Sequence, residues 1–171
     1  MTGPAAPAPT RRRRFGGLMA VIAIGVLASV ALLHHGSPST RAGTAAGRLG
    51  AIRVTDAYIP AQTSATVAAA YLTIRNTGPT AETLEQVTTD RAPSAQVMRE
   101  VTKGGVSSMT QEPGLAIPGH GTVMLTPGVE HLMLVNPPTR LIEGEVVNVT
   151  LRFARAGTLT LAVPVTAVGG P

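Results

Sequence analysis

Residues 145–167 read "EVVNVTLRFARAGTLTLAVPVTA" and contain two runs rich in Val, Leu, Thr and Phe, with "FARAG" between them. These residue types are favoured in β-strands. Gly supplies the backbone freedom that a turn requires. The stretch therefore predicts two strands separated by a turn.

The same alternation of β-rich runs and turn residues extends back to Ala51. Seven further strands are expected near "AIRVTDAYI", "ATVAAAYLTIRN", "TLEQVTT", "AQVMREV", "VSSMTQ", "GTVMLTP" and "HLMLV". Separators such as "NTGPT", "KGG" and "IPGHG" carry Gly, Pro and Asn. Short strands over ~115 residues, with no amphipathic helix and no internal repeat, predict an all-β fold, an antiparallel sandwich or Greek-key barrel.

Length and composition limit the chain to one folded domain. It has 171 residues, of which 44% are hydrophobic and 13% are charged, enough for a single core. Its aromatic residues are Phe15, Tyr58, Tyr71 and Phe153, and Phe15 lies in the N-terminal segment. We therefore expect an aliphatic core.

The positive net charge belongs to the N-terminal third of the chain. Residues 1–50 carry six Arg and no acid, whereas residues 51–171 carry eight Lys or Arg and all nine Asp or Glu. The predicted β domain is close to neutral, so it lacks the basic surface of a nucleic-acid-binding protein. No nucleic-acid partner is expected.

The basic cluster precedes an apolar segment that is long enough to span a membrane. Residues 1–14 form a basic N-region, and residues 15–33 contain 19 uncharged, mostly apolar positions. At ~1.5 Å per residue, a helix of this length matches the ~30 Å hydrocarbon layer. The positive-inside rule keeps the arginines in the cytoplasm and places everything after Leu33 outside.

This segment is either a transmembrane anchor or a cleaved signal peptide. Ala28 and Ala31 offer small residues for cleavage, and Arg12–Phe15 resembles a twin-arginine signal. The sequence has no Cys, so no lipid can be attached through a thiol. Either route predicts a protein in the periplasm or on the outer face of the bacterial cell membrane.

The remaining boundaries follow from composition. Residues 34–50 are small and polar, as in a flexible linker that does not pack. The β domain is expected at residues 51–167, followed by a short tail at residues 168–171. His34 and His35 in the linker could bind a metal, although such a pair is more often incidental.

Several classes of function are excluded by the residues that the chain lacks. Without Cys there is no disulfide, thiolate zinc site or blue-copper centre. The β domain holds only His120 and His131, and neither lies in a nucleophile elbow or a zinc-protease motif. We therefore expect no enzymatic activity.

Methionines supply a different set of candidate residues. In "AQVMREVTKGGVSSMTQ", a loop of Lys103-Gly104 would pair Met98 with Met109, and a loop of Gly104-Gly105 would make them diagonal neighbours. Both registers place the two thioethers on one face. In "EHLMLV", His131 and Met133 share the face opposite Leu132 and Leu134.

Three thioethers and one imidazole form a soft, nearly neutral ligand set suited to Cu(I). Zinc prefers thiolate, imidazole or carboxylate. The alternative is that these methionines fill gaps in the core. Met124 lies outside this pattern and is expected to pack, while His120 in "IPGHG" is expected to be an exposed turn residue.

Residues 51 to about 167 resemble the periplasmic copper chaperone family called PCu(A)C. The copper motif of that family is His or Met, ten residues, Met, twenty-one residues, His, one residue, Met. Met98, Met109, His131 and Met133 fit this spacing. "DAYIP", "AAAYLTIRNTG" and "GLAIPGHGTVMLTPGVEHLMLV" extend the resemblance along the domain. Many members have His where this chain has Met98, a change that favours Cu(I) over Cu(II).

The resemblance implies a cupredoxin-like Greek-key sandwich or barrel. It also implies that the four residues bind one Cu(I) and deliver it to a cuproprotein, such as the copper A centre in subunit II of cytochrome c oxidase. Two alternatives remain open. One is a copper-resistance or storage protein, and the other is a protein-binding β-sandwich without metal.

Overall fold

The computed structural model describes Gly3 and residues 39–41, 43–63 and 66–171. All of its strands belong to the unit His34–Pro171. The predicted membrane segment, residues 15–33, lies outside the described residues. Among the residues that are described, no helix has the length and apolar character needed to cross a bilayer.

Strands account for all the regular secondary structure of the described residues. They are β1 (Ser39–Arg41), β2 (Thr44–Leu49), β3 (Ile52–Pro60), β4 (Val67–Asn76), β5 (Glu82–Thr89), β6 (Ser94–Lys103), β7 (Val106–Gln111), β8 (Leu115–Ile117), β9 (Thr122–Leu125), β10 (Glu130–Val135), β11 (Val146–Phe153) and β12 (Gly157–Thr166). All nine predicted strands are present, and β1, β2 and β8 are additional.

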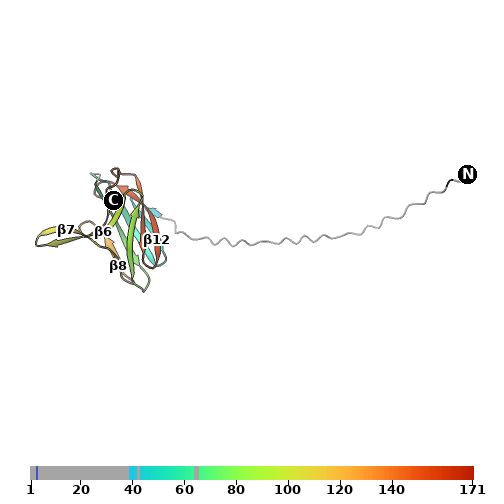
Figure 1. The fold of residues 1–171 in the computed structure, drawn as a ribbon, viewed down its shortest axis with the longest axis horizontal. Helices are drawn as coiled ribbons and strands as arrows, with labels where there is room; N and C mark the ends of the chain where they lie inside the picture. Colours follow the sequence, from blue (N-terminus) through green and yellow to red (C-terminus); the bar gives the residue numbers. More distant parts are fainter. Residues whose placement is uncertain (1–2, 4–38, 42, 64–65) are drawn as a thin grey trace. The chain divides into compact units, whose positions relative to one another are not determined.

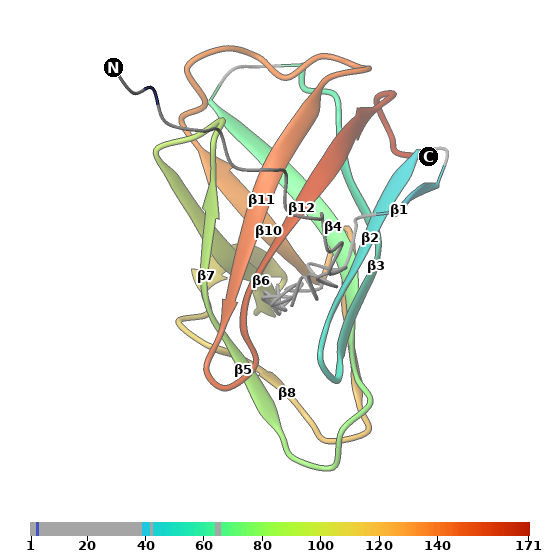
Figure 2. The ribbon, with the colours of Figure 1, turned by 90° about the vertical axis from the view of Figure 1, so that its right-hand side faces the viewer.

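Seven strands form a closed barrel. They pair in the order β3-β12-β11-β5-β6-β10-β4, and β4 pairs with β3 to complete the circuit. Figure 2 shows β11 and β12 on the near side of this barrel, with β4 and β10 behind them. The remaining five strands extend the barrel at its sides: β2 on β3, β1 on β2, β7 on β6, β8 on β5 and β9 on β4.

One pairing departs from the predicted antiparallel arrangement. β12 runs parallel to β3, with Val165 opposite Ile59 and Thr166 opposite Pro60, while every other strand pair in the described chain is antiparallel. The Ala61 N–H donates to the Thr166 carbonyl at 2.9 Å and continues the contact. The first and last strands of the barrel are therefore joined directly.

The core is aliphatic, as predicted. Alternate side chains of the barrel strands point inward, and Phe153 is the one aromatic residue in the buried cluster of the described chain. β11 illustrates the period of two, because Val147, Val149 and Leu151 are fully buried while Asn148 is exposed. Removing apolar area from water stabilises the folded chain by ~25 cal/mol per Å², so burial of these side chains is the main stabilising contribution.

The domain begins before Ala51, within the segment predicted to be a flexible linker. β2 pairs with β3, and its Ala45 is buried in the core. A Cβ on Gly47 would lie 2.4 Å from Leu161 Cδ2, so this strand approaches the barrel more closely than a larger residue allows. The small residues that suggested a linker instead permit close packing.

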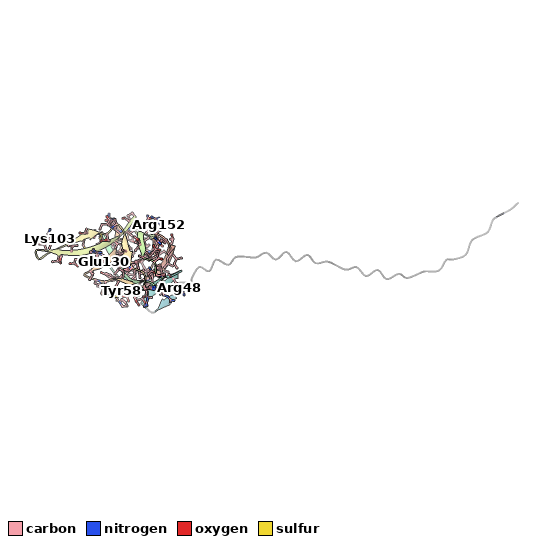
Figure 3. The ribbon with its side chains drawn as sticks, turned by 90° about the horizontal axis from the view of Figure 1, so that it is seen from below. Arg48, Tyr58, Lys103, Glu130 and Arg152 are labelled. Atoms are coloured by element: carbon pink, nitrogen blue, oxygen red, sulfur yellow. The ribbon has the colours of Figure 1, made fainter. Side chains whose placement is uncertain are left out.

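The hairpin of β6 and β7 projects from the barrel (Figure 1). Lys103 lies near its tip, at the end of the hairpin far from the barrel (Figure 3). Lys103 pairs with Val106, so the loop is Gly104-Gly105, and both glycines have positive φ, 61° and 79°. This is the backbone of a type I′ turn, which matches the twist of the two strands.

Candidate metal centre

His131 and Met98 lie directly opposite each other on paired strands. β10 and β6 are antiparallel neighbours, and their register places His131 across from Met98 and Met133 across from Gln96. Directly opposed residues have Cβ atoms about 4.5–5.5 Å apart, and diagonal neighbours about 7–8 Å apart. Met98 therefore lies next to His131 and diagonal to Met133, all on one face of the sheet.

Met109 joins this face from β7. Met98 pairs with Gln111 and Glu100 pairs with Met109, so the loop is the Gly104-Gly105 alternative and the two methionines are diagonal neighbours. The structure thus brings all four predicted residues to the outer face of three adjacent strands. The opposite face of β10 carries Leu132 and Leu134, which are fully buried in the barrel.

The four side chains differ in their exposure. Met98 and His131 are buried, with 8% and 9% of their surface exposed, Met133 is half-buried, and Met109 is 51% exposed. Met98 and His131 therefore form the covered side of the cluster, and Met109 forms its open side. The cluster is therefore shielded from solvent on one side and open to solvent on the other.

Two tyrosines, which the sequence did not indicate as site residues, continue the row of side chains beyond His131. The Tyr71 and His131 rings have centroids 6.2 Å apart, and Tyr58 lies 5.4 Å from Tyr71. A Cβ on Gly170 would lie 2.9 Å from Tyr58 Cε2, so the C-terminal tail covers this ring. Tyr71 alternates with buried Leu72, but only the pairing of β4 with β10 shows that it reaches the imidazole.

Burial sets the electrostatics of the imidazole. Desolvation lowers the pKa of His131 below its ordinary value of 6.5, while the charge of Glu100 acts in the opposite direction. The dominant effect favours the neutral ring, which has a free nitrogen lone pair for a metal. The site is therefore suited to coordination near neutral pH without first losing a proton.

An ion cluster holds the base of the hairpin on the other face of these strands. The Arg99 Nε–H donates to Glu130 Oε1 at 2.6 Å, which links β6 to β10. Another guanidinium nitrogen of Arg99 lies 3.5 Å from Glu112 Oε2, just after β7. These contacts connect the three strands that carry the candidate ligands.

Two further residues that the sequence singled out, His120 and Met124, are not part of this cluster. His120 is exposed in a turn with φ of 53°, as expected. The prediction that Met124 packs is wrong, because its side chain is 61% exposed on the peripheral strand β9. No group of three His, Cys, Asp or Glu side chains suited to a metal occurs in the described part of the chain, and His34 and His35 lie outside it.

Residues 52–165 match a protein-family model described as "Putative lipoprotein LpqE-like". The chain belongs to the LpqE-like family. A relative from Leifsonia xyli subsp. xyli, "Putative lipoprotein Lxx21020", is 35% identical over 115 residues, which cover 67% of this chain and 69% of the relative.

Solved structures of PCuAC domains share the fold. A structure titled "Solution structure of CuI-DR1885 from Deinococcus Radiodurans" is 32% identical, with a TM-score of 0.56 over 67% of this chain and 77% of that one. A copper-bound PCuAC domain from PmoF2 is 23% identical, with a TM-score of 0.60 over 71% of this chain and 97% of that domain. The resemblance to PCu(A)C and the cupredoxin-like all-β fold are confirmed.

Proposed function

We propose that this LpqE-like protein is a copper chaperone that works outside the cytoplasm. One observation carries the proposal: the residues that fit the copper-motif spacing gather on one face of β6, β7 and β10, with His131 opposite Met98. The likeness to a Cu(I)-loaded relative that is 32% identical supports the same function.

The proposed site binds one Cu(I) through Met98, Met109, His131 and Met133. Thioether sulfur and neutral imidazole are soft or intermediate donors that favour Cu(I) over hard cations. Met98 and His131 provide a covered base for the ion, and the exposed Met109 leaves one side accessible. Such a site can retain copper and still release it to a partner, which a fully buried site could not do.

The proposed acceptor is a cuproprotein such as the copper A centre in subunit II of cytochrome c oxidase. Residues 15–33 would hold the domain at the membrane or direct its export, as predicted from the basic and apolar N-terminal segments. The family description as lipoproteins agrees with a location outside the cytoplasm.

Anaerobic titration of the chain with Cu(I) against a competing chelator tests the binding. We expect one copper per chain and X-ray absorption dominated by sulfur neighbours. A spectrum with only nitrogen and oxygen neighbours would contradict the site. Incubation of the loaded chain with the apo copper A domain distinguishes a chaperone from a storage protein, because a storage protein retains its copper.

A further inference from the structure

β7 differs from the other strands that have a single partner. Within the described chain, β1 and β8 have three residues each and β9 has four, whereas β7 has six. Native proteins commonly protect sheet edges by keeping edge strands very short. β7 is the longest of these strands, and all six of its side chains are exposed.

β7 also lacks the other features that prevent strands from pairing at an edge. Its sequence, "VSSMTQ", contains no charged residue and no Pro, although both are common on protected edges. The hairpin projects from the barrel, so no other described strand lies along its free side (Figure 1). The free edge, residues 107–111, is therefore open to a further strand.

The backbone register shows which groups point to this edge. The Glu112 N–H donates to the Val97 carbonyl at 2.9 Å, which continues the pairing of β7 with β6. Hydrogen-bonded pairs alternate along an antiparallel ladder, so Thr110 and Ser108 direct their backbone groups to β6. Ser107, Met109 and Gln111 direct theirs to the free edge.

We propose that this free edge is the docking strand for an extended segment of the copper acceptor. The inference rests on the proposed copper site, because Met109 belongs to both. A strand paired with β7 would place one residue opposite Met109, on the same face, with Cβ atoms about 5 Å apart. A Met or His at that position reaches the copper ion.

The transfer is a ligand exchange without redox change. A bond forms between Cu(I) and the sulfur or nitrogen of the partner, and the bond to Met109 sulfur breaks. Copper stays in the +1 state, and no proton or electron moves. Met109 is the ligand to exchange first because it is 51% exposed, whereas Met98 and His131 are buried.

The chemistry of the edge specifies the form of the partner. The unpaired backbone N–H and C=O groups on the free edge of β7 can form hydrogen bonds with an extended strand of the partner. A helix cannot replace that strand, because its backbone groups are already bonded within the helix. A second copy of β7 could pair in the same way, but it would bring no vacant ligand and would cover Met109.

Proline at residue 107 tests the docking, with alanine at the same position as the matched control. Ser107→Pro removes an outward N–H and leaves the hydrogen bonds to β6 in place. Ser107→Ala removes the same hydroxyl, which lies 3.0 Å from the Thr102 hydroxyl, and keeps the N–H. Both full-length variants should bind Cu(I) as the parent does.

The readout is the rate of Cu(I) transfer to the apo copper A domain of a cytochrome c oxidase subunit II. Losing one backbone bond should slow transfer by Ser107→Pro about tenfold relative to Ser107→Ala. Equal rates in the two variants would overturn the docking proposal alone. If the parent chain binds no Cu(I), the proposed function itself is wrong, and the docking proposal falls with it.

Amide exchange gives a second readout with an alternating pattern. In the free chain, the amides of Ser107, Met109 and Gln111 should exchange quickly, and those of Ser108 and Thr110 slowly. Adding the apo copper A domain should protect the first set and leave the second unchanged. The proposal would be overturned if exchange is unchanged at all five positions. It would also be overturned if the protection comes from β7 pairing between two copies of this chain.

Discussion

Met133 and Met124 are matched residues for separating copper ligation from packing. Met133 is half-buried beside His131, whereas Met124 is exposed on β9 and outside the motif spacing. We expect Met133→Leu to lower Cu(I) affinity, because Leu has no lone pair, while costing less than ~1.5 kcal/mol of unfolding free energy. Met124→Leu should change neither quantity.

Chelator competition and urea unfolding measure these two effects. If Met133→Leu and Met124→Leu bind Cu(I) equally well, Met133 is a packing residue and not a ligand. If Met133→Leu loses several kcal/mol of stability, its thioether fills a tightly packed site instead. The first result would remove one of the four proposed ligands.

The sequence could predict only part of this site. Because side chains alternate along a strand, His131 and Met133 had to share a face, and the short "KGG" loop had to keep Met98 and Met109 together. The pairing of β6 with β10 is a long-range contact that depends on the whole barrel. For the same reason, the proximity of Tyr71 to His131 could not be predicted.

At the scale of the strand, β2 should contribute to stability although its sequence resembles a linker. The test compares the stability of a chain that begins at Ser39 with that of a chain that begins at Ala51. The shorter chain loses the buried Ala45 and exposes the edge of β3. Its urea midpoint should be lower, and it should associate at high concentration through the exposed edge. Equal midpoints would show that β2 contributes nothing.

The Gly104-Gly105 turn should matter more for copper than for folding. Gly105 has φ of 79°, and a β-branched residue is strained at positive φ. The strained backbone at residue 105 of Gly105→Val should lower the free energy of unfolding by about 1–2 kcal/mol. The variant should also bind Cu(I) more weakly, because Met109 would be misplaced. Lys103→Ala at the same tip is the control. Thermal unfolding and chelator competition check both, and unchanged Cu(I) affinity in Gly105→Val would argue against Met109 as a ligand.

The segment before β11 gives a prediction at acidic pH. The Ile142 N–H and Arg91 both donate to the Glu145 carboxylate, and these bonds lower the pKa of Glu145 below 4.5. The ionised carboxylate is favoured in the folded chain. Its contribution to the free energy of unfolding is therefore present above pH 4.5 and is lost as pH falls through the lowered pKa. Glu145→Gln should remove this pH dependence from urea unfolding measured between pH 6 and pH 3. An identical dependence in the variant would contradict it.

The strands that the sequence missed are short or made of small residues. β1 and β8 have three residues each, too few for alternation to be detected. β2 is rich in Ala and Gly, and its close packing against Leu161 is visible only in three dimensions. The nine predicted strands carry larger apolar side chains between clear turn residues, and that pattern is sufficient without tertiary information.

The orientation of the whole molecule across the membrane remains a prediction from its charge distribution. Arg11–Arg14 should stay in the cytoplasm, and the β domain should lie outside. A reporter active only outside the cytoplasm, fused after residue 38, should be active. A reporter that works only in the cytoplasm should be inactive at the same position, and the reverse pattern would contradict the orientation.

The parallel contact of β3 with β12 also determines when the protein can fold. The barrel closes only when its last strand meets its first, so a growing chain cannot complete the core before residues 157–166 have been synthesised. Folds dominated by contacts between distant residues form slowly, in milliseconds to seconds. The nascent chain therefore has no complete core until its last strand has been made, and a chain in that unfolded state can be threaded through a narrow channel, as the export predicted from the N-terminal segment would require.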